Sequence, residues 1–378
     1  MIPSQKIAFV VHGLNLGGAE KFMISLINHF LKNDCEVVLY LLSNEMHLLH
    51  EIDERVKVDV ILRKYRFDFT ASFRLKQKLL NDNIDKIVCI NTYSFFFVKL
   101  GLLFNKTFQV YLSVHSTIPT SLKNYVQNFL YFKLLQKNDT VIYLCENQKQ
   151  YLKKNYFLNH HNDYVINNGV DTLYFNPVKF QPIDRYLYRM SFNLKHNEKV
   201  ILKVARLSPE KGHHDAIEAL YLLHDKYKEK AHLFFVGDGK PEYVNELKNY
   251  VIDRGLHDFV HFEGNKIDVR KYYLIADLFT LTSYNTETFS LAALEAMAFG
   301  LPCSLTEIGG ASEMHLSGLT GILTRPHDPL NIADSWYNLL TRQPKKEKIR
   351  QFVLDKFEVS QMLAYYQKIL FQPILNVS

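Results

Sequence analysis

The chain has 378 residues, of which 47% are hydrophobic and 22% are charged, and its net charge is +6. This length suggests two domains or one large one, and the composition excludes a disordered or low-complexity protein. Residues 1–178 carry 20 Lys and Arg against 15 Asp and Glu, whereas the remainder is nearly balanced. A bias of this size suits an anionic surface or substrate, but it does not indicate nucleic-acid binding.

The cysteines and the apolar segments indicate the compartment. The four cysteines, which are Cys35, Cys89, Cys145 and Cys303, are far apart in the sequence. This spacing predicts free thiols in a reducing compartment rather than disulfides or metal ligands. The most apolar window, residues 94–104, is too short to span a bilayer, and no N-terminal signal peptide is apparent. We therefore expect a cytoplasmic protein.

The first half alternates apolar strands with helices. Strands are predicted at residues 6–11, 36–42, 56–62, 86–90, 109–114 and 140–144 and near residue 165. Helices are predicted after the first strand and at residues 73–80, 121–135 and 146–156. Near-continuous apolar strands that alternate with helices are typical of a parallel sheet covered on both faces. The fold class is therefore α/β.

Two features of the first half lie where such sheets bind ligands. The first strand leads into a loop with Gly17 and Gly18 and then into a helix, an arrangement that binds phosphate or other anions. The alternative is a structural turn that uses glycine for positive φ. His115 directly follows the strand at 109–114 and is a second candidate, although a lone histidine is more often structural.

The predicted helix at 121–135 is rich in aromatic residues and carries lysines around it. Two interpretations stay open. It is either an ordinary helix packed on the core, or an interfacial helix in contact with anionic lipid.

The second half repeats the same alternation after residues 175–197, which have the composition of a connector. Strands are predicted at residues 199–204, 232–236, 259–263, 278–281, 303–305 and 321–323. The last predicted helix covers residues 359–370, where apolar residues recur at helical spacing.

Two cations follow the first strand of this half. Arg206 and Lys211 stand in the loop after residue 204. Arginine grips a phosphate in a bidentate way and lysine supplies a mobile point charge. This loop therefore predicts a phosphate site, with a solvated loop as the alternative.

Residues 281–302 form a strand end, a polar loop and a buried helix. Glu287 lies in the loop and Glu295 in the helix, which Ser290 or Thr288 can cap and Gly300 can end. A diphosphate at the amino end of this helix would leave Glu295 near the next group, a ribose. The alternative is a buried α/β unit whose acids are paired.

Together these segments are recognisable. They are residues 14–21 (LNLGGAEK), 114–116 (VHS), 168–177 (NGVDTLYFNP), 205–212 (ARLSPEKG), 235–240 (FVGDGK) and 287–302 with its two glutamates. In this order and spacing the chain resembles the glycosyltransferase family 4 group of GT-B enzymes across essentially its whole length.

The resemblance implies a fold and an activity. The fold has two Rossmann-like domains that face each other across a cleft: residues 1–178 on the acceptor side and 179–357 on the nucleotide-sugar side. A final helix at about 358–378 packs back on the first domain. The activity is a retaining transfer of a hexose or N-acetylhexosamine from a nucleoside diphosphate sugar, with a UDP-sugar expected. The acceptor is a surface polysaccharide, lipopolysaccharide or lipid-linked glycan. Neither a metal nor a cofactor is expected.

The resemblance also assigns roles to residues. Arg206 and Lys211 bind the diphosphate, Glu287 holds the sugar hydroxyls, Glu295 holds the ribose, and His115 lies near the reacting carbon. The remaining expected donor-binding residues are Gly17, Gly18, Gly264, Asn265, Phe289, Ser290 and Leu291, with the base near Gly264 and Asn265. We further expect the first domain to contact anionic lipid at the inner face of the plasma membrane.

One departure from the family bears on the donor. Where the family usually has Glu-Gly-Phe-Gly, this chain has Glu287-Thr288-Phe289-Ser290, so close approach of the sugar to the backbone is less assured. Two other activities of the same fold stay open: a nucleotide-sugar epimerase and a non-catalytic sugar-nucleotide-binding subunit. The glycine spacing disfavours a nicotinamide dehydrogenase.

Overall fold

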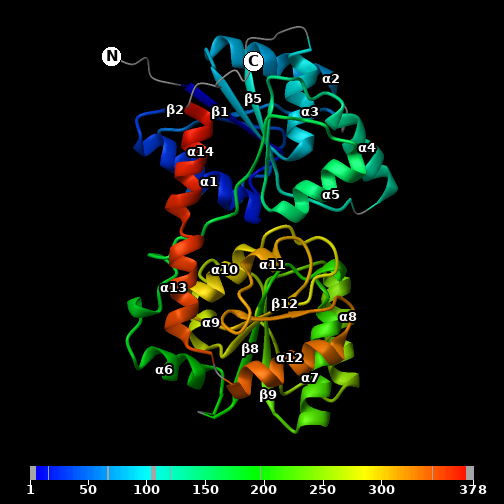
Figure 1. Cartoon of the computed structure of the whole chain (residues 1–378), viewed down its shortest axis with the longest axis vertical. Coiled ribbons are helices and arrows are strands. Elements are labelled where there is room, and N and C mark those ends of the chain that lie inside the picture. Colours follow the sequence, from blue (N-terminus) through cyan, green and yellow to red (C-terminus); the bar gives the residue numbers. More distant parts are fainter. Residues whose placement is uncertain are drawn as a thin grey trace. The chain divides into compact units, whose positions relative to one another are not determined.

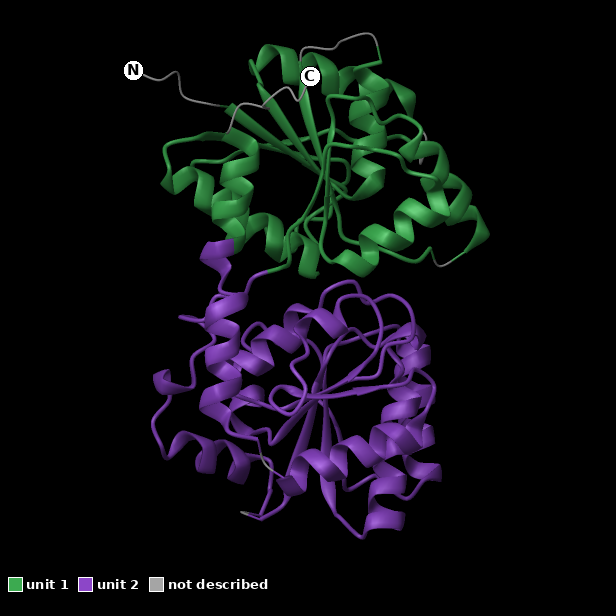
Figure 2. Ribbon diagram, viewed as in Figure 1, with its two compact units in different colours: residues 1–168, 362–378 green, residues 169–361 purple. Residues whose placement is uncertain are grey.

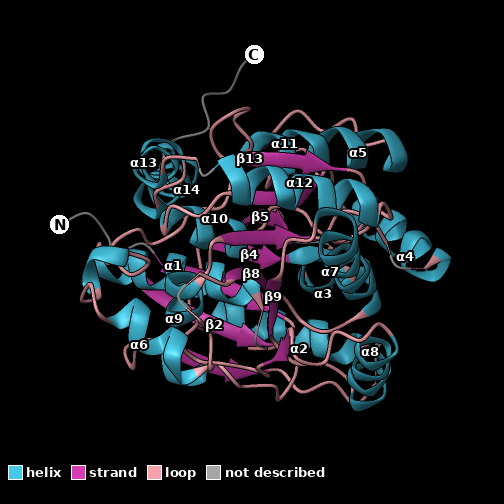
Figure 3. Cartoon of the chain, turned by 90° about the horizontal axis from the view of Figure 1, so that it is seen from below, coloured by secondary structure: helices cyan, strands magenta, loops and turns pink. Residues whose placement is uncertain are grey.

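The computed structural model describes residues 6–15, 17–65, 68–103, 108–119, 121–195, 197–342 and 344–371. The chain divides into two compact units, residues 1–168 with 362–378 and residues 169–361 (Figure 2). In each unit, helices flank a parallel sheet (Figure 3). The predicted α/β class with two doubly wound halves is confirmed.

The first unit is built on a parallel sheet with the order β3-β2-β1-β4-β5-β6-β7. Its strands are β1 (Lys6–Val11), β2 (Glu36–Leu41), β3 (Lys57–Val60), β4 (Lys86–Ile90), β5 (Gln109–Val114), β6 (Thr140–Tyr143) and β7 (Asp163–Val165). Its helices are α1 (Gly18–Lys32), α2 (Phe69–Asn81), α3 (Asn91–Gly101), α4 (Leu122–Phe132), α5 (Glu146–Tyr156) and, from Met362 onward, α14 (Val359–Phe371).

Both faces of this sheet are buried, as the apolar strands require. One core cluster joins side chains of α2, α3, α4 and α5 to one face. On the other face α1 and α14 lie side by side (Figure 1): Tyr366 contacts Phe22 with ring centroids 5.3 Å apart and bonds the Ser113 hydroxyl. Residues 372–378 of the predicted final helix lie outside the described part of the chain.

The second unit contains the sheet β10-β9-β8-β11-β12-β13. Its strands are β8 (Lys199–Val204), β9 (Ala231–Val236), β10 (Val260–Phe262), β11 (Leu278–Leu281), β12 (Cys303–Thr306) and β13 (Gly321–Thr324). Its helices are α6 (Asp184–Ser191), α7 (His213–Tyr227), α8 (Pro241–Asp253), α9 (Arg270–Ile275), α10 (Leu291–Ala298), α11 (Ala311–Met314), α12 (Pro329–Arg342) and α13 (Lys346–Lys356). A core cluster centred on the fully buried Trp336 packs α7, α8 and α12 on one face.

Strand order locates the ligand edge of each sheet. In the first unit the chain runs outward from β1 to β3 and then returns to β4 on the other side of β1. In the second unit β8 and β11 are related in the same way. Open α/β sheets bind ligands at the carboxyl ends of the two strands where the order reverses. Each unit therefore has one such edge, β1/β4 and β8/β11.

Most of the apolar window at 94–104, which is too short to span a bilayer, is the core helix α3, whose Phe95 and Phe97 are fully buried. Two expectations for the second unit need correction. The presumed connector at 175–197 contains α6, held on the second unit by Arg185, which donates to Asp277 over 2.7 Å. The sequence analysis missed this helix because it is short and because the residue that it buries is Arg189 rather than an apolar residue. Helices α12 and α13 were not predicted.

The boundary between the units also lies earlier than residue 178. Val170 N donates to Phe357 O over 2.8 Å, and Val359 N donates to Val170 O over 3.0 Å. These backbone bonds attach residues 169 onward to the second unit, so the division falls at 168/169.

Candidate functional site

The β8/β11 edge of the second unit brings two predicted residues together. Lys211 ends a short 3-10 turn, Pro209–Lys211, after β8, and Glu287 lies in the loop after β11. Lys211 Nζ lies 2.7 Å from Glu287 Oε2, with the two side chains 16% and 18% exposed. A cation and a carboxylate therefore meet at the edge where a ligand is expected.

The backbone around this pair is closely fixed. Gly212 has φ +64, and a Cβ there would lie 1.9 Å from Thr282 O, so the loop after β8 rests directly on the end of β11. Gly309 has φ +53, and a Cβ there would lie 2.2 Å from Glu287 O. Only glycine fits these close approaches at positive φ. The positions of Lys211 and Glu287 are thus set by main-chain packing.

Arg206 occupies the same loop but faces solvent. Its side chain is 72% exposed and pairs with Glu210 over 3.2 Å, while Ser208 Oγ donates to the same carboxylate oxygen over 2.7 Å. An exposed pair of this kind contributes little stability. The guanidinium can therefore exchange Glu210 for an incoming anion at small cost.

The start of α10 explains the departure from the family pattern. Ser290 caps the helix by accepting from Ala293 N over 3.3 Å, with φ −76. Neither Thr288 nor Ser290 has positive φ, so the absence of glycine causes no backbone strain here. Leu291 begins the helix, and the ring of Phe289 packs 5.7 Å from Phe357. The Phe289 side chain thus serves packing, and a donor contact there would use its backbone.

Glu295 lies in the second turn of α10 and is 9% exposed. Its Oε2 accepts from Tyr273 OH over 2.7 Å. Burial, together with the Glu295 charge, raises the pKa of Tyr273 well above its usual value, so the phenol stays a hydrogen-bond donor. This contact fixes one oxygen of the carboxylate, and its ribose role stays a prediction.

The loop with Gly264 and Asn265 is anchored to the same edge. Gly237 N donates to Gly264 O over 3.0 Å, and Gly237 in turn rests on Ala205, where a Cβ would lie 2.1 Å from the carbonyl oxygen. Asn265 is exposed beside it. The predicted base-binding loop therefore adjoins the residue before Arg206.

Sequence reasoning missed Lys203, which is fully buried in β8. Its Nζ donates to Thr282 Oγ1 over 2.9 Å, and that hydroxyl donates to Gly212 O over 2.6 Å. Burial, with a smaller effect of Lys211, lowers the pKa of Lys203 to about 7. A lysine inside the apolar strand at 199–204 was the available signal.

In the first unit, Gly17 caps α1 with φ −147, which is extended backbone. The interpretation of Gly17 as a positive-φ turn is therefore wrong. Gly18 is the first residue of α1. Gly17 N donates to Asn15 O over 3.0 Å, and the anion-binding role of this helix start stays a prediction.

His115 follows β5, as predicted, but its surroundings are internal to the first unit. Its Nε2 lies 3.0 Å from Ser113 Oγ, its backbone N donates to Asn91 Oδ1 over 2.7 Å, and its ring centroid lies 4.5 Å from that of Phe22. Burial lowers the pKa of His115 to about 3. The ring is therefore neutral near pH 7 and can only offer a neutral hydrogen bond.

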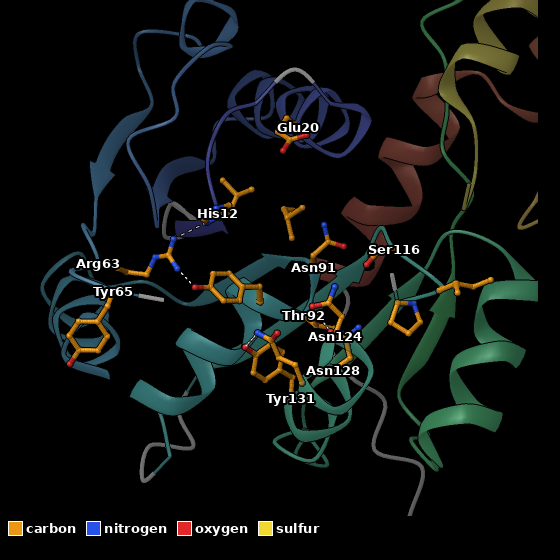
Figure 4. A pocket seen from close by; sticks show the side chains of 16 residues that line it. His12, Glu20, Arg63, Tyr65, Asn91, Thr92, Ser116, Asn124, Asn128 and Tyr131 are labelled. Atoms are coloured by element: carbon orange, nitrogen blue, oxygen red, sulfur yellow. Dashed lines mark hydrogen bonds between the residues drawn. The ribbon is translucent and has the colours of Figure 1, made fainter. Parts of the chain in front are cut away.

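The β1/β4 edge of this unit holds a pocket of about 610 Å³ that the sequence did not reveal (Figure 4). Its polar lining includes His12, Glu20, Arg63, Asn91, Asn124 and Asn128. A signal was present: Asn124, Gln127 and Asn128 stand at helical spacing in the predicted helix at 121–135.

Two further observations concern metals and membranes. The described residues include no group of three or more His, Cys, Asp or Glu placed to hold a metal ion. None of the helices in the described part of the chain combines the length and apolar character needed to cross a bilayer.

Two doubly wound sheets, one with a cation and a carboxylate at its switch point, define the GT-B class of glycosyltransferases. The model of "Glycosyltransferase Family 4" matches residues 16–173, and that of "Glycosyl transferases group 1" matches residues 184–353. The chain belongs to the family 4 group of GT-B glycosyltransferases.

Similar proteins agree with this assignment. The chain is 29% identical to N-acetyl-alpha-D-glucosaminyl L-malate synthase of Bacillus anthracis over 187 residues, 48% of each chain. It is 34% identical to the UDP-Gal:alpha-D-GlcNAc-diphosphoundecaprenol alpha-1,3-galactosyltransferase of Escherichia coli over 181 residues, 47% of this chain and 44% of that one. These matches span about half the length of the curated relatives. Anabaena HepE in complex with UDP-glucose shares the fold, with a TM-score of 0.83 at 21% identity over 97% of this chain and 99% of that one.

Proposed function

We propose that this protein is a retaining hexosyltransferase that moves a hexose or N-acetylhexosamine from a UDP-sugar to a hydroxyl of a growing glycan. The observation that carries the proposal is the Lys211–Glu287 pair at the β8/β11 edge, 2.7 Å apart. A cation suits the diphosphate, and an adjacent carboxylate suits the hydroxyls of the attached sugar.

In the proposed reaction the bond between the anomeric carbon and the diphosphate breaks, and the acceptor oxygen bonds to that carbon on the same face. The acceptor proton passes to the departing diphosphate. Lys211 and Arg206 neutralise the leaving charge, and the amino end of α10 adds its partial positive charge. Because the protein's own cations carry this neutralisation, we assign no resident metal or cofactor to the step.

The UDP assignment is supported by what similar proteins bind. The E. coli relative is named for a UDP-Gal donor, and Anabaena HepE has been solved with UDP-glucose. A binding screen of UDP-, GDP- and ADP-sugars tests it, and NMR of the product's anomeric configuration tests retention. Conversion of the donor to a new sugar nucleotide without any acceptor would instead indicate an epimerase.

We place the protein at the inner face of the plasma membrane, acting on a surface-polysaccharide, lipopolysaccharide or lipid-linked acceptor. Helix α4 supports this placement. Leu122, Val126 and Leu130 recur every four residues along it and are 78%, 49% and 59% exposed. Lys123 and Lys133 flank this apolar stripe. Exposed apolar residues with neighbouring lysines suit an anionic lipid surface, whereas core packing accounts for Tyr125, Phe129, Tyr131 and Phe132 on the other side of the helix.

A further inference from the structure

The pocket at the β1/β4 edge lies wholly within the first unit and contains none of the residues assigned to the donor. Its volume of about 610 Å³ is in the range of small-molecule sites. It also occupies the switch point of its sheet, which is the expected ligand position. The pocket is therefore a candidate binding site separate from the residues assigned to the donor.

Amide side chains form one wall of the pocket. Asn124, Gln127 and Asn128 lie on the same face of α4 and line it. Thr92 Oγ1 donates to Asn128 Oδ1 over 2.8 Å, which orients that amide with its NH₂ group as the remaining donor. Amides both donate and accept, so a row of them matches the hydroxyls of a sugar ring.

Asn91 adds a closely held amide directly after β4. Its φ is +67, a conformation that non-glycine residues seldom adopt. Its Oδ1 accepts from His115 N over 2.7 Å, and Figure 4 shows the side chain directed into the pocket. The bond to His115 N therefore fixes the position of this amide in the pocket.

Arg63 places a pre-organised cation at another wall. Its Nε donates to Leu42 O over 2.7 Å, and its guanidinium lies 4.9 Å from the ring centroid of Tyr93 and 5.6 Å from that of Phe97. Its Nη2 lies 3.2 Å from His12 Nδ1 (Figure 4). Burial, and then the Arg63 charge, lower the pKa of His12. The positive potential of Arg63 therefore extends into the pocket.

Glu20 places a negative charge at a second wall of the pocket. It comes from the first turn of α1, on a different wall from Arg63 (Figure 4). An anionic group in the pocket is attracted by Arg63 and repelled by a Glu20 carboxylate. One orientation of an acidic ligand is thereby favoured.

We propose that this pocket binds the terminal sugar of the acceptor and selects an acidic one, with the anionic substituent on Arg63 and the ring hydroxyls on the amides of Asn91, Asn124 and Asn128. The identification of the ligand as the acceptor rests on the proposed glycosyl transfer. The recognition of an acidic saccharide itself is independent of the donor site.

The test uses the full chain and two matched pairs of probes: methyl glucuronide with methyl glucoside, and methyl galacturonide with methyl galactoside. Dissociation constants are measured by saturation-transfer NMR. In at least one pair the acidic member should bind about tenfold tighter, the worth of one charged hydrogen bond. Arg63→Gln should remove this preference, and Asn124→Ala should weaken both members of the pair.

Arg55→Gln is the matched control, because Arg55 is 61% exposed in the same unit and pairs with Asp53 away from the pocket. It should leave both members of each pair unchanged. If Arg63→Gln does not fold, Arg63→Lys keeps the charge and should retain a reduced preference. Equal binding of acidic and neutral members, no binding of any probe, or a preference that survives Arg63→Gln overturns the inference.

A parallel titration with UDP separates this inference from the proposed function. Normal UDP binding with no acid-selective binding in the pocket defeats the inference and leaves the transferase proposal intact. Acid-selective binding without UDP binding defeats the UDP-sugar transferase proposal and leaves an acidic-saccharide site.

Discussion

Lys203 Nζ donates a hydrogen bond to Thr282 Oγ1 over 2.9 Å, and both side chains are fully buried in the second unit. The Thr282 hydroxyl in turn donates to Gly212 O over 2.6 Å and to Lys211 O over 3.2 Å. A buried lysine in β8 thus supports the loop that carries Lys211.

Lys203 should make stability depend on pH. Burial lowers its pKa from 10.5 to about 7 in the folded protein. Between pH 7 and 10.5 the Lys203 amine is protonated in the unfolded chain but not in the folded chain, so the free energy of unfolding rises with pH. Below pH 7 the amine is protonated in both states, and the folded protein bears the full cost of burying the charge. Lys203→Met should flatten this rise, a difference on the order of a few kcal/mol across the window. Urea unfolding at pH 7 to 10 measures it.

The control for that experiment is Lys248→Met, which makes the same chemical change on the exposed side of α8. It should unfold with the wild-type pH slope. A Lys203→Met variant with the same slope as Lys248→Met would show that Lys203 does not titrate in this window.

Thr282→Val should disturb donor binding without unfolding the protein. The change removes the acceptor for Lys203 and the donor to Gly212 O, at a cost of about 1–3 kcal/mol for buried groups left unpaired. We expect the KM for the donor to rise by about fivefold or more as the loop loses its support, with a smaller change in kcat. Thr282→Ser keeps the hydroxyl and should restore the KM. Equal kinetics in the valine and serine variants would contradict the role.

Lys211→Ala and Glu287→Gln should distinguish the contact with the donor's diphosphate from the contact with its sugar. Without the Lys211 cation, UDP should bind about 10- to 100-fold more weakly, the worth of a charge-assisted hydrogen bond. Glu287→Gln should leave the affinity for UDP nearly unchanged but reduce transfer, because the sugar loses its carboxylate. Calorimetry with UDP, alongside transfer rates, measures both. Loss of UDP binding in Glu287→Gln alone would contradict the assignment.

Gly300→Ala tests the end of α10. Gly300 has φ +78, and a Cβ there would lie 2.7 Å from Lys346 O. Gly255 has nearly the same φ, +66, but no atom within 4 Å of the added carbon. Gly255→Ala should therefore cost about 1 kcal/mol for the backbone alone, and Gly300→Ala clearly more. Thermal unfolding of the two variants compares them, and equal losses would rule out the close approach as the cause.

The exposed stripe on α4 should govern membrane association. Val126→Glu with Leu130→Glu adds charge where the proposed lipid contact lies, so sedimentation with phosphatidylglycerol vesicles should fall strongly. The same pair of substitutions at the exposed Tyr365 and Ile252, on α14 and α8, should leave sedimentation unchanged. Retained binding in the α4 variant would remove the helix from the proposed membrane face.

The sequence placed Lys211 and Glu287 in the loops after two apolar strands. The structure brings the two side chains together because these neighbouring parallel strands end at one edge, and their roles in the donor site stay predictions. The pocket was not predicted, because Arg63, Asn91 and Asn124 come from three separate segments that only the completed sheet assembles. Lys203 was overlooked although a lysine inside an apolar strand is visible in the sequence, because its partner Thr282 lies 79 residues further along the chain. Helix α6 was missed because it is short and because its buried side carries Arg189 while its apolar residues Leu187 and Met190 are exposed.

The backbone bonds between Val170 and residues 357 and 359 have a consequence for synthesis. They place the entry and exit of the second unit next to each other, so residues 169–361 are an insertion within the first unit. Tyr366, which fills a fully buried position beside Phe22, reaches the first unit only after the whole insertion has been translated. During translation the Phe22 side of α1 therefore lacks its contact with Tyr366 until residues 169–361 have been synthesised. We expect a chaperone that binds apolar surface to act on this protein during that interval.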